Sequence, residues 1–265
     1  MKTAIVVPAR FASSRYPGKP LVPLTGAHGR AKPLIQRSWE AAMAVPGIDR
    51  VIVATDDDRI ADVARGFGAT VAMTPETCRN GTERCAAVLP ALDDIDLVVN
   101  LQGDAPLTPP GFVTALIDAM AADATITMAT PVLRATPGVH ARLLADQTAG
   151  RVGGTTAAVG LRGDALYFSK AVIPHIPPSR ADDPGLPRFL HIGVYAYRPA
   201  TLEAYAAHPP SPLELLEGLE QLRFLENGMA VRVVEVAPPG YDLWELNNPE
   251  DVTAVETALA LAGLD

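Results

Sequence analysis

Short apolar runs alternate with helical patterns along the first part of the chain. The apolar runs are bounded by Pro, Asp or Gly, which is typical of strands buried on both faces of a sheet. They cover residues 4–7, 50–54, 70–73 and 95–101. Helical spacing of apolar residues lies between them, over 33–45, 59–67 and 81–92. This alternation predicts an α/β protein with a doubly wound, mostly parallel sheet and right-handed crossovers.

The pattern weakens in the middle of the chain and recovers towards its end. Residues 135–190 contain several Gly and a Pro-rich stretch, and we expect them to form a less regular insertion within a single domain spanning 1–265. Strands are expected over 126–133, 191–197 and 231–236, and helices over 212–225 and 249–261. The amphipathic pattern over 212–225 predicts one continuous helix with most of its Glu side chains in solvent.

Composition and charge narrow the class of ligand. The 265 residues carry a net charge of −8, which opposes general nucleic-acid binding, and no apolar stretch reaches membrane-spanning length. Residues 1–3 run directly into the first predicted strand, so we expect no signal peptide and a cytoplasmic protein. Two cysteines, Cys78 and Cys85, are too few for a disulfide framework and are expected to be reduced.

A basic loop follows the first strand, which must end at Pro8. The loop carries three cations, with Ser13, Ser14 and Gly18 between them, and residues 8–24 contain no acid. The cations are Arg10, Arg15 and Lys19. Loops at the carboxyl ends of parallel strands bind ligands in such sheets, and Gly18 allows backbone N–H groups to approach phosphate. The cluster therefore favours a polyphosphate site over a solvated basic loop.

Three further polar segments follow predicted strands. Residues 56–58 are acidic and either cap the next helix or bind a metal, and capping is favoured at a helix start. Residues 80–83 combine turn chemistry with a start resembling a capping box, and their alternative role is contact with a nucleotide. Asp104 lies just after a strand end, where a carboxylate would hold Mg²⁺ on a phosphate chain.

Several motifs in order along the chain resemble the 3-deoxy-manno-octulosonate cytidylyltransferase family, the CMP-Kdo synthetases. They are IVVPARFASSRYPGKPL, VIVATDD, NGTER, LQGD, ALYFSKAVIP, HIGVYAYR, SPLELLEGLEQLRFL and NNPEDV. The match is collinear over nearly the whole chain. No GxGxxG follows the first strand, so the rival interpretation of a dinucleotide oxidoreductase loses its main support.

The resemblance implies a Rossmann-like nucleotidyltransferase fold with a smaller inserted dimerisation region, and a homodimer. It also implies an enzyme that uses CTP and Mg²⁺ to place CMP on a small anionic acceptor, the sugar acid Kdo, with release of pyrophosphate. The acceptor oxygen would attack the α-phosphorus in line, while cations stabilise the charge on the phosphates. We expect the protein to bind neither nucleic acid nor a membrane.

The same resemblance assigns roles residue by residue. By this resemblance, the triphosphate would be held by Arg10, Ser13, Arg15 and Lys19. The base and ribose would lie near Ala9 and the turn of Asn80, Gly81, Thr82, Glu83 and Arg84. The acceptor pocket falls to Gln102, His191, Tyr195, Glu220 and Gln221. Asp104 is the Mg²⁺ ligand, and it joins Arg10 and Lys19 as the catalytic candidates.

Some positions depart from the family pattern. Ala105 stands where the family has Glu, Asn247 stands where it has a second metal-binding Asp, and Thr156 lies where it has Lys. Glu245, two residues before Asn247, resembles the arrangement in other CMP-transferring enzymes, so Asp104, Glu245 and Asn247 are the metal candidates. Two alternatives therefore stay open: CMP transfer to a small phosphonate such as phosphonoformate, and an inactive nucleotide-binding relative.

Overall fold

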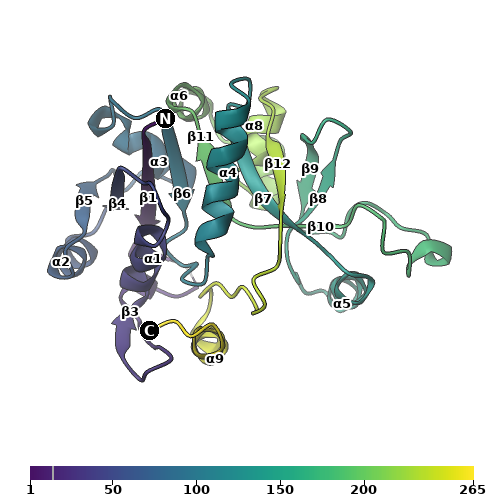
Figure 1. The fold of residues 1–265 in the computed structure, drawn as a ribbon, viewed down its shortest axis with the longest axis horizontal. Helices are drawn as coiled ribbons and strands as arrows, with labels where there is room; N and C mark the ends of the chain where they lie inside the picture. The colour runs from purple at the N-terminus through teal and green to yellow at the C-terminus, as the bar shows by residue number, and fades with distance from the viewer. Residues whose placement is uncertain (14) are drawn as a thin grey trace.

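Four parallel strands form the amino-terminal half of a large sheet, in the order β5-β4-β1-β6 (Figure 1). The computed structural model describes residues 1–13 and 15–265, so Ser14 of the predicted phosphate loop lies outside the described residues. The strands are β1 (Thr3–Ala9), β4 (Arg50–Thr55), β5 (Thr70–Met73) and β6 (Leu97–Leu101). These bounds confirm the predicted parallel strands. Their carboxyl ends meet at one edge, which brings the loops after them together.

The carboxyl-terminal half of the sheet adds antiparallel neighbours. Next to β6 lies β11 (Val194–Tyr197), followed by β7 (Met128–Arg134), β10 (Phe189–His191), β8 (Thr156–Val159) and β9 (Ala165–Ser169). β12 (Arg232–Val236) pairs in parallel with β7. A separate two-stranded ribbon joins β2 (Pro23–Thr25) to β3 (Ala31–Pro33). The α/β class is confirmed.

Helices cover both faces of the sheet (Figure 1). One core lies beneath α1 (Leu34–Met43), α2 (Asp58–Gly66) and α4 (Pro110–Ala122). The other lies beneath α3 (Gly81–Val88), α6 (Pro199–Ala207) and α8 (Leu222–Glu226). A third, smaller cluster packs α9 (Val252–Leu261) against Leu24, Leu34 and Leu246, and this packing carries the segment before α9 towards the loop after β6.

Three helices were not predicted from the sequence, α6 among them. α4 is apolar on nearly all sides and therefore shows little amphipathic period. α5 (Pro137–Thr148) buries only His140 and Leu143, so its pattern is weak as well. It lies in the predicted insertion 135–190, together with β8 and β9, which extend the main sheet. That this segment is a dimerisation region stays a prediction.

The prediction of one continuous helix over 212–225 is wrong. α7 (Pro212–Glu217) ends at Gly218, whose φ of 62° is left-handed, and α8 begins only at Leu222. The strand predicted over 191–197 is likewise divided between β10 and β11, with Ile192 and Gly193 outside both. Both breaks lie beside the cleft described below, and they change which side chains point into it.

No helix in residues 1–13 and 15–265 is long and apolar enough to cross a membrane.

Candidate active site

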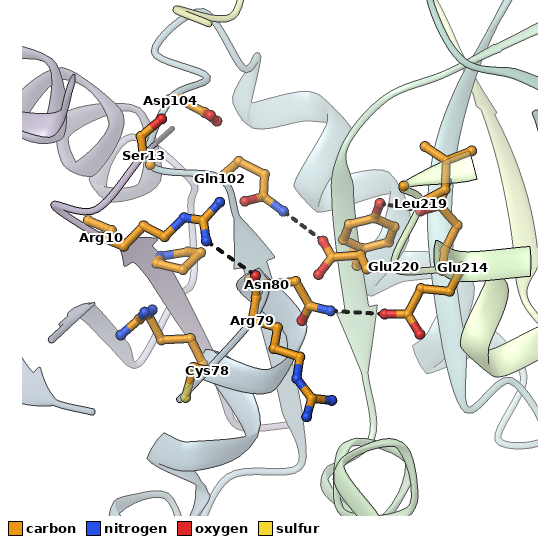
Figure 2. A pocket seen from close by; sticks show the side chains of 18 of the residues that line it. Arg10, Ser13, Cys78, Arg79, Asn80, Gln102, Asp104, Glu214, Leu219 and Glu220 are labelled. Carbon is orange, nitrogen blue, oxygen red and sulfur yellow. Dashed lines mark hydrogen bonds between the residues drawn. The ribbon is translucent and has the colours of Figure 1, made fainter. Parts of the chain in front are cut away.

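A cleft of about 510 Å³ lies over the carboxyl ends of the parallel strands (Figure 2). Its first wall is the loop after β1, including Arg10, Ser13, Arg15 and Lys19. Its floor includes Gln102 and Asp104 after β6, and its far wall is the turn between α7 and α8. Because the strand ends meet at this edge, segments that are distant in sequence converge on a single cavity.

Phe11 organises the phosphate loop. Its carbonyl oxygen accepts hydrogen bonds from the N–H groups of Ser13 at 2.9 Å and Gly18 at 3.0 Å. Gly18 has a φ of 71°, and a Cβ atom there would lie 3.1 Å from the Phe11 ring. The Phe11 ring also contacts Arg59, whose guanidinium carbon lies 3.4 Å from the ring centroid. These contacts fold the loop so that its cations face the cleft.

Two of the loop cations contact oxygen atoms of segments distant in the chain, those of Asp104 in the floor of the cleft and of Asn247 outside its lining. Lys19 Nζ donates to Asp104 Oδ2 at 2.6 Å, and Arg15 Nη2 donates to Asn247 Oδ1 at 2.8 Å. The Leu246 N–H donates to the Asp104 carbonyl at 3.1 Å, which fixes the segment 245–247 beside Asp104. The three metal candidates named from the sequence are therefore neighbours in space.

The donor chemistry of these neighbours fits Mg²⁺. Asp104 and Glu245 supply carboxylate oxygens and Asn247 an amide oxygen, all hard ligands. Within the described residues, no three His, Cys, Asp or Glu side chains form a metal cluster by themselves. Mg²⁺ commonly uses one or two carboxylates together with substrate phosphates, and this set suits that arrangement.

The negative charge of Asp104 affects the ionisation of Glu245. The residue is exposed by surface area, but protein atoms crowd its carboxyl group, and that loss of water together with the charge of Asp104 raises the pKa of Glu245 to about 7. Arg15 and Lys19 oppose this shift. Two carboxylates that disfavour each other's ionisation form a site where a cation is stabilised.

The start of α3 forms another part of the wall. Asn80 caps the helix, with its Oδ1 accepting from the Glu83 N–H at 2.8 Å, which confirms the predicted helix start. Gly81 is needed at the next position, because a Cβ atom there would lie 2.9 Å from Asn100 Nδ2. The Thr82 side chain is buried away from the cleft, and its N–H donates to Glu220 Oε2 at 2.9 Å.

Arg84 is buried and paired at the ends of the strands. Its Nη2 donates to Asp56 Oδ2 at 2.7 Å, and its Nη1 contacts the Thr74 hydroxyl. Asp56 is thereby used in an ion pair, while Asp57 caps α2 by accepting from the Arg59 N–H at 3.0 Å. The prediction that capping outweighs metal binding in residues 56–58 is confirmed for Asp57.

The residues predicted for the acceptor form a polar group opposite the phosphate loop. Gln102 Nε2 donates to Glu220 Oε1 at 3.1 Å, as Figure 2 shows, and the Tyr195 hydroxyl donates to Gln221 Oε1 at 3.1 Å. Burial raises the pKa of Glu220, and its bonds from Thr82 and Gln102 oppose the shift. Among residues 1–13 and 15–265, no hydrogen-bond partner is found for the buried Gln221 Nε2 atom, which is a donor in this wall.

His191 is the predicted acceptor residue that the structure does not bring to the lining of the cleft. Its Nε2 lies 2.9 Å from the Thr130 hydroxyl, and its ring packs between Phe168 and Tyr195. Burial lowers the pKa of His191 to about 3, so the ring is neutral at physiological pH. It therefore supports Tyr195 from behind.

Sequence reasoning missed several residues that line the cleft. Among them are Cys78, Arg79, Glu214 and Leu219. Most Glu side chains of 212–225 were expected in solvent, but Glu214 is buried, where it accepts hydrogen bonds from the Ser211 N–H and from the Arg223 guanidinium. The local signal for Glu214 is the Ser211-x-x-Glu214 spacing of a capping box, whereas Gly218 marks the end of α7.

A parallel sheet with a cation-rich loop after its first strand and a carboxylate after its fourth defines a nucleotidyltransferase, and the chain matches the family model described as Cytidylyltransferase over residues 4–231. Among curated proteins, it is 45% identical to the 3-deoxy-manno-octulosonate cytidylyltransferase of Maricaulis maris, with 99% of both chains covered. It is 40% identical to the enzyme of that name from Zea mays, over 96% of this chain and 80% of the relative. The chain belongs to the 3-deoxy-manno-octulosonate cytidylyltransferase family.

A solved structure supports the same conclusion. The chain is similar to a CMP:2-keto-3-deoxy-manno-octonic acid synthetase complexed with CTP, with a TM-score of 0.83 and 34% identity. The alignment covers 98% of this chain and 99% of that one. The resemblance seen in the sequence motifs is therefore confirmed, and the protein is a nucleotidyltransferase.

Proposed function

We propose that this protein transfers CMP from CTP to Kdo and releases pyrophosphate. The observation that carries the proposal is a single cleft with phosphate-binding cations on one wall and a buried polar group on the other. The relatives described above carry the sugar-acid name, which supports Kdo over phosphonoformate. The cation loop and Asp104 also favour an active enzyme over a silent nucleotide-binding relative.

In this proposal the loop after β1 holds the triphosphate. Arg10, Arg15 and Lys19 contribute positive charge, and Ser13 contributes a hydroxyl donor. Ala9 and the start of α3 lie near the base and ribose, with Arg84 held below them by Asp56. Charge spreads onto the phosphates as the α-phosphorus reacts, so fixed cations stabilise the transition state more than the ground state.

Asp104, Glu245 and Asn247 would hold Mg²⁺. The bound ion would neutralise phosphate charge and favour departure of pyrophosphate. Lys19 and Arg15 contact two of these groups, and an incoming triphosphate offers both cations a more highly charged partner. The exchange would leave the oxygens of Asp104 and Asn247 available to the metal.

The acceptor would bind between Gln102 and the turn of Glu220 and Gln221. A sugar acid with several hydroxyls needs both donors and acceptors, and this wall supplies the Gln221 amide, the Tyr195 hydroxyl and the Glu220 carboxylate. His191 would hold the Tyr195 ring in place. One acceptor oxygen would then face the α-phosphorus opposite the pyrophosphate, so positioning supplies much of the acceleration.

Incubation of the protein with CTP, Mg²⁺ and either Kdo or phosphonoformate tests the proposal, with product mass and pyrophosphate measured. We expect CMP-Kdo and one pyrophosphate per product, and an Asp104→Asn control with much reduced turnover. CMP-phosphonate without CMP-Kdo would refute the acceptor and keep the cytidylyl chemistry. Absence of pyrophosphate with both acceptors would support the silent relative.

We further propose a cytoplasmic homodimer. Leu166 of β9 and Leu215 and Leu216 of α7 are 68%, 70% and 82% exposed, and large exposed apolar side chains favour a protein partner. Light scattering should give twice the chain mass, and Leu166→Glu should shift the protein towards the monomer. A monomeric wild-type protein at micromolar concentration would refute the dimer.

A further inference from the structure

A buried arginine lies behind the wall of the cleft. Arg223 at the start of α8 is 1% exposed, and its guanidinium binds Glu214 through two hydrogen bonds of 2.6 Å. The same guanidinium donates to Glu83 Oε1 at 2.9 Å and stacks over Tyr205, 4.0 Å from the ring centroid. Arg223 therefore ties α7, α3 and α6 together from one position.

The contacts of Arg223 close into a ring through the cap of α3. Asn80 Nδ2 donates to the Tyr205 hydroxyl at 2.8 Å and approaches Glu214 Oε1 at 3.3 Å, the latter drawn in Figure 2. The Tyr205 hydroxyl in turn donates to Glu214 at 3.4 Å. Since Asn80 also accepts from the Glu83 N–H, both ends of the ring meet at the start of α3.

The ring joins the two halves of the cleft. Its α3 side carries the turn assigned to the nucleotide, whereas Arg223 lies two residues after Gln221 of the acceptor wall. Glu220 adds a parallel link, as it accepts from both the Thr82 N–H and Gln102. Removing one partner from a buried charge network leaves the others unpaired, so such a network resists partial opening. The two walls should therefore move as one body.

We propose that Arg223, acting through Tyr205, Glu214 and Asn80, is a positioning residue that couples nucleotide binding to acceptor binding. This inference rests on the proposed function. A nucleotide that orders the start of α3 also orders the acceptor wall. The acceptor then loses less conformational entropy when it binds, so it binds more tightly. The coupling is reciprocal: each ligand tightens the other by the same factor.

Tyr205→Phe is the test variant, because Arg223→Met would leave Glu214 buried without its cation and risks unfolding. The substitution removes the hydroxyl that binds Asn80 and keeps the ring beneath Arg223. Tyr167→Phe is the matched control, since its hydroxyl lies 3.5 Å from Glu217 and outside the ring of contacts. Glu83→Gln is a second variant, which neutralises the other carboxylate on Arg223.

Calorimetry without Mg²⁺ measures CTP affinity in the absence and presence of saturating Kdo, and steady-state kinetics gives kcat and KM. In the wild type and in Tyr167→Phe, we expect Kdo to tighten CTP binding about fivefold or more, within the usual range of such coupling. In Tyr205→Phe and Glu83→Gln the ratio should fall towards one, with KM raised for both substrates and kcat changed less.

A wild-type ratio in both variants, or a ratio of one in the wild type itself, would overturn the coupling while CMP-Kdo formation leaves the proposed function in place. Failure of Kdo to bind and to accept CMP would instead overturn the proposed function, and the coupling with it.

Discussion

Replacement of Lys19 by Met should separate transition-state stabilisation from folding stability. The Lys19 ammonium lies 2.6 Å from Asp104 Oδ2, and the two side chains are 12% and 27% exposed. Met keeps most of the apolar stem and removes the charge alone. The variant therefore tests the charge without opening a large cavity.

The expected kinetic effect follows from the charge on the phosphates. At about 4 Å and an effective dielectric constant of about 20, two unit charges interact by about 4 kcal/mol. Loss of one preorganised donor to a developing oxyanion commonly costs about 100-fold to 1,000-fold in rate, or about 2.7–4 kcal/mol. We expect kcat/KM for CTP to fall by that factor.

The expected effect on stability is small. Asp104 keeps 27% of its surface in water, so it can be hydrated once Lys19 is gone, and the pair contributes about 1 kcal/mol. Such a loss lowers Tm by about 2–4 °C in a protein of this size class. Lys32→Met is the matched control, because Lys32 pairs with Glu40 at 2.8 Å with similar exposures of 19% and 33%, outside the lining of the cleft.

Pyrophosphate release with CTP, Mg²⁺ and Kdo gives the kinetic constants, and thermal unfolding gives Tm. Lys32→Met should keep kcat/KM within about twofold, while Lys19→Met loses activity at a similar Tm. Unchanged kcat/KM in Lys19→Met would refute the assignment of the phosphate loop. Equal losses of activity in both variants would show that the loss comes from folding.

Three further outcomes are expected. Gly18→Ala should raise KM for CTP about tenfold in the same assay, because a Cβ atom at φ 71° would meet the Phe11 ring at 3.1 Å, and a wild-type KM would refute a rigid loop. Glu245→Gln should shift the Mg²⁺ activation curve to higher concentration, with Glu250→Gln as control, whereas coinciding curves would remove Glu245 from the metal site. His191→Gln should flatten the pH dependence of Tm: the pKa of His191 is lowered to about 3 by burial, so only the unfolded chain binds this proton and stability falls as pH drops below about 6.5. Identical Tm losses between pH 7 and pH 4 in wild type and variant would contradict that reasoning.

The amino-terminal half of the fold and the phosphate loop were predictable from local pattern. β1, β4 and β6 are largely apolar runs because central parallel strands are buried on both faces, and nothing outside each run is needed to see it. The cap at Asn80 is equally local, since its side chain satisfies the helix's own N–H groups. The sequence motifs indicated the family, and the family resemblance in turn indicated the candidate residues of the cleft.

The acceptor wall was decided only by tertiary contacts. The pattern over 212–225 satisfies the spacing of one helix, but Glu214 is drawn inward by Arg223, which bonds it twice at 2.6 Å. Gly218 permits the left-handed turn that this inward position requires. An amphipathic pattern records which side chains are apolar and not which charges will find a buried partner from another helix.

Tertiary packing also brings the three metal candidates close together. Glu245 and Asn247 follow Asp104 by more than a hundred residues, and the packing of α9 against Leu24 and Leu34 brings their segment to the sheet edge. The sequence by itself determined the strands, the helix cap and the chemistry of the cation loop, because each depends on residues close in the chain. Only the tertiary structure decided which distant carboxylates, amides and cations face one another across the cleft, since a long-range contact depends on how every element between them packs.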